Sequence, residues 1–105
     1  MKRGDVRWYK FEKPDKSRPV VVLTRDSIIP HISEVTVAPV TSTIRDIPSE
    51  VLLDSGDGMP RKCAVNCDHM QTVAKAKIGS LLTSLSATRM REIRTAIVFA
   101  IALNE

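Results

Sequence analysis

Residues 17–25 read Ser17-Arg18-Pro19-Val20-Val21-Val22-Leu23-Thr24-Arg25, so that an unbroken apolar run follows directly on an arginine and a proline. This run predicts a strand over residues 19–25 that is covered on both faces. Proline restricts the residue before it to extended backbone, and Arg18 is therefore expected to stand preorganised in front of that strand. Two interpretations follow: Arg18 is a solvated charge at a strand start, or the strand holds Arg18 in place for binding.

Patterns elsewhere in the chain predict further short strands separated by turn residues. They cover residues 4–11, 34–40, 50–53, 63–67, 70–73 and 77–82. After residue 85 the apolar period becomes helical, with Ser86 as the N-cap and with Leu85 and Met90 in the positions of a hydrophobic staple. Residues 96–103 are apolar nearly all round, which favours packing on the sheet and against a partner subunit, although packing of one face only stays open. The pattern predicts a mainly β protein with a C-terminal helix, as in small curved barrels or SH3-like sheets.

Composition narrows the class of protein. The 105 residues suit a single domain, residues 1–105, with a hydrophobic share of 43% and a charged share of 27%, as in ordinary globular proteins. The formal net charge of +4 mildly favours a polyanionic partner. The chain has no membrane-length apolar segment, and its start lacks the apolar region of a signal peptide. We therefore expect a cytoplasmic protein that does not enter a membrane.

The two cysteines admit two interpretations. On a strand, Cys63, Cys67 and His69 share one face, which suggests a zinc site. The spacing lacks a Cys-x-x-Cys pair and a clear fourth ligand, so buried free thiols are favoured and no metal is expected. A catalytic pair of Cys67 and His69 is disfavoured because Val65 marks the same face as directed toward the core.

Polar residues at the ends of the predicted strands are the remaining candidates for chemistry, since the usual catalytic motifs are missing from the sequence. They are Arg18, the run from Thr41 to Thr43, Asn66, Asp68, Gln71 and Thr72. Guanidinium, hydroxyl, carboxylate and amide groups gathered at one rim can hold and polarise a phosphodiester. Basic residues predicted in loops can add attraction for a phosphate backbone or be merely solvated; they are Lys13, Lys16, Arg25, Arg45, Arg61 and Lys62.

Several segments, taken in order, resemble the MazF/PemK toxins of bacterial toxin–antitoxin systems. They are KRGDVRWYKF, RPVVVLTR, VTVAPVTSTIR, VNCDHMQTV, IGSLLTSLS and the closing amphipathic helix, over about residues 2–103. The resemblance implies a small curved SH3-like β-barrel with a C-terminal helix, assembled as a homodimer. It also implies metal-independent cleavage of single-stranded RNA at short sequences, leaving a 2′,3′-cyclic phosphate and a 5′-hydroxyl, and a cognate MazE-like antitoxin that blocks the RNA groove.

The resemblance also implies roles for single residues. Arg18 matches an arginine that would stabilise the charge of the pentavalent phosphorane, and Thr41 matches a residue that would hold a phosphate oxygen or orient the 2′-hydroxyl. Asp68 matches an acidic residue of one branch and would be the base or fix Arg18 through an ion pair. Asn66 and Gln71 depart from the family pattern of basic residues and are expected to read bases. The other expected RNA contacts are Lys16, Arg25, Thr43 and Arg45.

Two other classes of function stay open at this point. CcdB-like proteins use the same barrel to inhibit DNA gyrase and depend on a C-terminal Trp-Gly-Ile, whereas this chain ends Ala102-Leu103-Asn104-Glu105. The third class is an SH3-like nucleic-acid-binding module without activity. For the ribonuclease, the expected partners are single-stranded RNA, the antitoxin and a second copy of the chain, with DNA reached only through the antitoxin and no cofactor.

Overall fold

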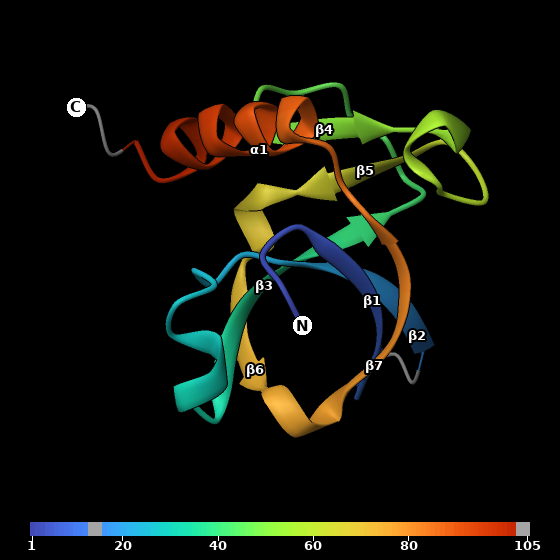
Figure 1. The fold of residues 1–105 in the computed structure, drawn as a ribbon. Helices are drawn as coiled ribbons and strands as arrows, with labels where there is room; N and C mark the ends of the chain where they lie inside the picture. Colours follow the sequence, from blue (N-terminus) through green and yellow to red (C-terminus); the bar gives the residue numbers. More distant parts are fainter. Residues whose placement is uncertain (13–15, 103–105) are drawn as a thin grey trace.

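The computed structural model describes residues 1–12 and 16–102, which form a strongly curved antiparallel sheet with one α-helix lying on it (Figure 1). The strands are β1 (Asp5–Phe11), β2 (Lys16–Val22), β3 (Glu34–Thr41), β4 (Glu50–Leu53), β5 (Cys63–Asn66), β6 (Gln71–Ala74) and β7 (Ile78–Ser84). Their order across the sheet is β4-β5-β3-β2-β1-β7. Strand β6 also pairs with β3, so β3 meets β6 along its first half and β5 at its end.

The apolar run of β2 is covered on both faces, as its composition predicts. Val20 and Val22 lie in one buried cluster and Val21 lies in the other, and all three are fully buried. The predicted limits of the strand are wrong, because β2 starts at Lys16 and Arg18 is paired opposite Tyr9 inside the strand. After Val22 the hydrogen bonding between β2 and β3 becomes irregular. The hydroxyl of Thr24, in place of a backbone carbonyl, accepts the backbone N–H of Thr36 at 2.8 Å.

Two apolar clusters hold the fold together. One lies between α1 (Ala87–Ala100), the β4–β5 layer and the adjoining faces of β2 and β3, and the other is enclosed by the curled strands below it (Figure 1). The first includes Val21, Val65, Cys67 and Ile93. The second includes Val20, Val22, Val35 and Val37.

The predicted strand over residues 63–67 ends one residue early, and this changes the placement of His69. Cys67–His69 forms a single 3₁₀ turn, η3, after Asn66. The side-chain oxygen of Asn66 accepts the backbone N–H of Asp68 at 3.0 Å, which diverts the chain from the strand. The alternation assumed for Cys63, Cys67 and His69 therefore breaks.

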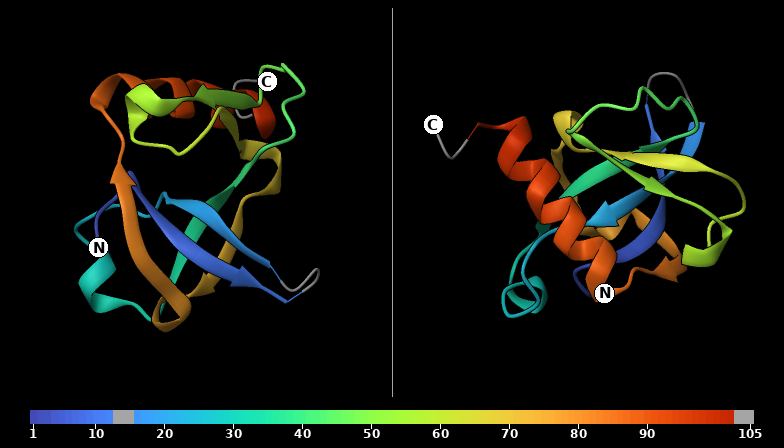
Figure 2. Two further views of the ribbon diagram at one scale, coloured as in Figure 1. Left: turned by 90° about the vertical axis from the view of Figure 1, so that its right-hand side faces the viewer. Right: turned by 90° about the horizontal axis from the view of Figure 1, so that it is seen from above.

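The helix begins as predicted, since the hydroxyl of Ser86 accepts the backbone N–H of Arg89 at 3.2 Å. It ends at Ala100, short of the predicted residue 103, which lies outside the described residues. One face of α1, with Ile93 and Ala96 buried, covers the β4–β5 layer (Figure 2). Its apolar character continues onto an exposed side.

Candidate functional site

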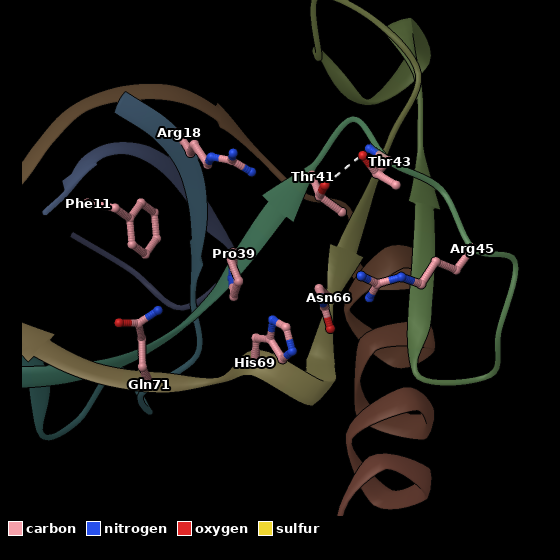
Figure 3. Close-up of a pocket in the computed structure, with 9 residues that line it drawn as sticks. All are labelled: Phe11, Arg18, Pro39, Thr41, Thr43, Arg45, Asn66, His69 and Gln71. Carbon is pink, nitrogen blue, oxygen red and sulfur yellow. Dashed lines mark hydrogen bonds between the residues drawn. The ribbon is translucent and has the colours of Figure 1, made fainter. Parts of the chain in front are cut away.

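A cavity of about 420 Å³ opens where the end of β3, the turn η3 and the start of β6 come near β2 (Figure 3). Its lining combines two guanidinium groups, two hydroxyls, two amides and one imidazole with an aromatic ring and a proline. These residues are Phe11, Arg18, Pro39, Thr41, Thr43, Arg45, Asn66, His69 and Gln71. Among the described residues that line it, none carries a carboxylate, so the cavity favours an anionic ligand.

A second cavity of about 530 Å³ adjoins the first, since Arg18, Thr41 and Thr43 line both. The rest of its lining comes from β1, the start of β2, the end of β3 and the segment between β4 and β5. These residues are Trp8, Lys16, Ser17, Pro19, Val40, Ser42, Met59, Pro60, Arg61 and Cys63. Arg18 and Thr41 therefore stand between two hollows, which suits a ligand that extends on both sides of one anionic group.

Arg18 is held by its strand. It is half-buried inside β2, it pairs with Tyr9 across the ladder, and Pro19 keeps its backbone extended. Figure 3 shows its guanidinium pointing away from β2 toward the end of β3. Within residues 1–12 and 16–102, no carboxylate forms an ion pair with it. Its fork of N–H donors is thus available to a ligand.

Thr41 ends β3, where it pairs with Ala64 of β5. Its hydroxyl oxygen accepts the backbone N–H of Thr43 at 3.1 Å (Figure 3). This contact occupies an acceptor position and leaves the O–H of Thr41 able to donate. A ligand oxygen placed beside Arg18 can therefore receive a further hydrogen bond from Thr41.

The loop that carries Thr43 and Arg45 is fixed by Glu50. One carboxylate oxygen of this buried side chain accepts the backbone N–H groups of Arg45 at 2.9 Å and of Asp46 at 3.2 Å. Asp46 takes a left-handed backbone with φ of 55°, which turns the chain sharply. Glu50 thus fixes the loop backbone from which the Arg45 side chain enters the first cavity.

Asp68 is hydrogen-bonded to a residue outside both cavities. Its carboxylate accepts the hydroxyl of Ser49 at 2.6 Å, and it lines neither cavity. In the described part of the chain no ion pair joins Asp68 to Arg18, which was one of the two roles expected for it. Asn66 does line the first cavity, but its side-chain oxygen is already used by the N–H of Asp68, so only its NH₂ group remains to donate.

Most of the residues predicted as RNA contacts meet in these cavities. Thr43, Arg45, Asn66 and Gln71 line the first cavity, and Lys16 lines the second. The exception is Arg25, which lies on the exposed segment after β2 and lines neither. Lys13 lies outside the described residues.

His69 is the residue whose placement the strand pattern misjudged. The alternation directs it toward the core, whereas it is exposed and its ring points into the first cavity (Figure 3). The signal that was available is the asparagine at position 66, because an Asn followed two residues later by a turn is a common local cap. Phe11, which also lines the cavity, was missed because it falls at the end of a strand.

Both cysteines are buried free thiols, as the sequence favours. Burial raises the pKa of the Cys67 thiol to about 11, with the Asp68 carboxylate adding to the effect. Burial is also the main cause that raises the pKa of Cys63. Both thiols therefore remain protonated at neutral pH and are poor nucleophiles.

The described residues lack two other kinds of feature. They contain no cluster of three or more His, Cys, Asp or Glu side chains arranged to hold a metal ion. No helix among them is long and apolar enough to cross a membrane.

Comparison with known proteins places the chain in a family. Residues 2–101 match the model of the PemK-like, MazF-like toxin of type II toxin-antitoxin systems. The chain is 44% identical over 100 residues to the probable endoribonuclease MazF5 of Mycobacterium tuberculosis, covering 94% of this chain and 91% of that protein. The chain therefore belongs to the MazF/PemK-like toxin endoribonucleases of type II toxin–antitoxin systems.

Solved structures agree with this assignment. The Mycobacterium tuberculosis toxin MazF-mt6 superposes with a TM-score of 0.86 at 33% identity, over 93% of this chain and 96% of that one. An endoribonuclease in complex with its cognate antitoxin, from a mycobacterial species, superposes with a TM-score of 0.88 at 25% identity, over 98% of this chain and 96% of that one. The mainly β architecture with one C-terminal helix is thus a MazF-like fold.

Proposed function

We propose that this chain is a metal-independent endoribonuclease that cuts single-stranded RNA at a short sequence and acts as the toxin of a toxin–antitoxin pair. Attack of the 2′-hydroxyl on the neighbouring phosphorus then gives a 2′,3′-cyclic phosphate and a 5′-hydroxyl. The observation that carries the proposal is the position of Arg18 and Thr41 between two adjoining hollows. A scissile phosphate at this junction leaves one hollow for the nucleotide on each side.

Arg18 has the chemistry to stabilise the reaction's transition state. The phosphorane formed on attack carries more negative charge on its oxygens than the ground-state phosphodiester, and paired N–H donors bind that charge preferentially. A guanidinium stays protonated at all working pH values, so its contribution is charge stabilisation rather than proton transfer. Thr41 adds an O–H donor to a phosphate oxygen or to the 2′-oxygen.

Base recognition is assigned to the residues that surround Arg18 and Thr41 in the two cavities. Asn66 and Gln71 present amide groups in the first cavity, and exposed base edges of single-stranded RNA are read by such hydrogen bonds. Trp8 and Phe11 each offer an aromatic side chain, one in each cavity, on which a base can stack. Lys16 and Arg45 add positive charge that attracts the phosphate backbone.

The proposal extends to assembly. The curl of the sheet around the second apolar cluster supports an SH3-like barrel, and closure would slow amide exchange along the free edges of β6 and β7. Phe99 of α1, Ile101 just after the helix and Leu52 on β4 are about half exposed, and large exposed apolar side chains support a homodimer. The antitoxin complex of the mycobacterial relative supports a MazE-like partner that blocks the RNA groove. Sedimentation equilibrium that returned the mass of one chain would rule out the homodimer.

The test is cleavage of a pool of RNA sequences by the purified protein in EDTA, followed by sequencing of the fragment ends. We expect cuts at one short shared motif with cyclic-phosphate and 5′-hydroxyl ends. Arg18→Ala is expected to lower the cleavage rate by about 10²–10³-fold, the usual effect of removing such a charge stabiliser. Arg25→Ala is the matched control, because it removes an arginine that lines neither cavity. Intact RNA, or equal activity of Arg18→Ala and wild type, would contradict the proposal.

A further inference from the structure

Among the described residues that line the first cavity, His69 carries the one imidazole, a group with a ring nitrogen that can accept a proton. A guanidinium offers donors and no acceptor, and the hydroxyl and amide groups are not basic. Attack by a 2′-hydroxyl requires that its proton be accepted. The cavity therefore contains a positive charge stabiliser and donors, and only the imidazole can act as a base.

The turn that carries His69 is held firmly in place. The backbone N–H of Cys67 donates to the carbonyl of Ser49 at 3.0 Å, and the N–H of Asp68 donates to Asn66. The hydroxyl of Ser49 in turn donates to Asp68, so two bonds join the turn to one residue. Cys67 itself is buried in the apolar cluster that contains Ile93 of α1. These contacts aim the exposed ring into the cavity without using its nitrogens.

The ring of His69 is open to a ligand in the first cavity. Figure 3 shows the imidazole directed toward Pro39, with Asn66 and Gln71 on either side of it. The charged groups that face this cavity are Arg18 of β2 and Arg45 of the β3–β4 loop. In the described part of the chain, neither ring nitrogen of His69 has a hydrogen-bond partner.

The carboxylates of the turn and of β4 are hydrogen-bonded to other groups. Asp68, the neighbour of His69, is bonded to Ser49, and Glu50 of β4 is bonded to the backbone of the β3–β4 loop. Helix α1 meets the turn through the apolar cluster that contains Cys67. The expectation that Asp68 is the base thus has less support than a base at His69.

We infer that His69 is the general base of the cleavage reaction, an inference that rests on the proposed function. A neutral ring nitrogen takes the proton of the 2′-hydroxyl as the 2′-oxygen forms its bond to phosphorus. The bond from phosphorus to the 5′-oxygen breaks, and that oxygen takes a proton from solvent. The imidazolium then returns its proton to water, so the cycle needs no other reactant.

The experiment compares wild type with His69→Ala and His69→Gln in single-turnover cleavage of the RNA motif found in EDTA, across a range of pH. Both variants are expected to cleave about 10²–10⁴-fold more slowly, the usual effect of losing a general base. Their affinity for the same RNA with a 2′-deoxy group at the cut is expected to stay within about threefold of wild type, because the base acts in the transition state. The fall in rate toward acidic pH is expected to disappear in both variants, and added imidazole is expected to restore part of the rate of His69→Ala.

Asp68→Asn is the competing variant. We expect it to keep the acid side of the wild-type pH profile, because the carboxylate is not the proton acceptor. Loss of that side in Asp68→Asn with its retention in His69→Ala would assign the base to Asp68 and overturn the inference. A rate of His69→Ala within about threefold of wild type would overturn it as well. Failure of wild type to cut RNA in EDTA, in contrast, would contradict the proposed function itself.

Discussion

Arg18 and Arg89 are two partly buried arginines with opposite surroundings. Arg89 donates from Nε to Asp57 at 2.9 Å and from a terminal nitrogen to Glu92 at 2.8 Å. Arg18 faces a cavity whose described lining is free of carboxylates. The hydrogen bond from Arg89 holds the pKa of Asp57 below its usual value, and the same contact raises the pKa of Arg89. A cation already neutralised by carboxylates stabilises the fold, whereas one facing an acid-free cavity can bind an external anion.

The two arginines also secure different parts of the chain. Arg89 ties helix α1 to the η2 turn (Ser55–Asp57), and the hydroxyl of Thr83 donates to the carbonyl of Asp57 at 2.9 Å from the other side. Gly58 follows with φ of 89° and lies so close to Thr83 that a side chain there would clash. The side chains around Arg89 are therefore held by contacts with one another. The N–H donors of Arg18, in contrast, remain available to a ligand.

The difference between the two arginines can be tested by placing a carboxylate next to Arg18. Gln71→Glu introduces one at an exposed position of the first cavity. We expect cleavage to fall by about 10- to 100-fold, because the new charge pairs with the guanidinium groups and repels the phosphate. The loss is expected to shrink in high salt. The measurement is the cleavage rate at two ionic strengths.

Two controls separate charge from contact in that experiment. Gln71→Ala removes the amide without adding charge, and its effect should not depend on salt. Ser80→Glu adds the same charge at an exposed residue of β7 that lines neither cavity, and it should cleave like wild type. If Ser80→Glu lost as much activity as Gln71→Glu, net charge rather than the local field at Arg18 would be responsible.

The next prediction concerns Arg89, the arginine that is paired with carboxylates. Arg89→Ala is expected to lower the free energy of unfolding by about 1–2 kcal/mol, since charge-assisted bonds contribute this much and the pair is only partly exposed. Cleavage by the folded variant should stay within about threefold of wild type. Urea unfolding and the cleavage assay measure the two effects.

Arg94→Ala is the matched control on the same helix, because Arg94 is exposed and has no carboxylate partner among the described residues. It should change stability by less than about 0.5 kcal/mol. Equal destabilisation by both variants would mean that helix propensity, rather than the pairing with Asp57, sets the cost.

Local patterns predict the elements of this fold well but fail where one side chain redirects the backbone. The strands and the Ser86 cap follow from alternation and from capping chemistry, which depend on neighbours in sequence. The turn at Cys67–His69 is held by the hydrogen bond from Asp68 to Asn66 and by two bonds to Ser49, and periodicity does not register them. With the turn in place, His69 lines the cavity instead of pointing into the core.

The site is predictable only in part because its members meet through distant pairings. Arg18 enters β2 because β1 extends the ladder across the hairpin, so its position depends on a partner strand. Asp68 turns to Ser49, nineteen residues earlier, and no local pattern indicates that contact. The resemblance to a family selects candidate residues, whereas their orientation follows from the tertiary contacts.

The smallest expected effect is the loss of stability at acidic pH in the region around Arg89 and Asp57. The pKa of Asp57 is lowered from its usual value of 3.8, so the carboxylate stabilises the fold fully above that pH. This stabilisation is lost as the pH falls through the still lower value of the folded state. Asp5 behaves alike: burial would raise its pKa, but the N–H of Lys2, the hydroxyl of Ser84 and the charge of Arg7 together lower it.

Arg89→Ala should therefore reduce the acid sensitivity of the protein without abolishing it. In the variant the carboxyl of Asp57 titrates closer to its unfolded value, so its share of the loss disappears, while that of Asp5 remains. Urea midpoints measured between about pH 5 and pH 2 should converge for wild type and variant as the pH falls. A constant difference between them across this range would show that Arg89 stabilises the fold by packing of its side chain and not through its charge on Asp57.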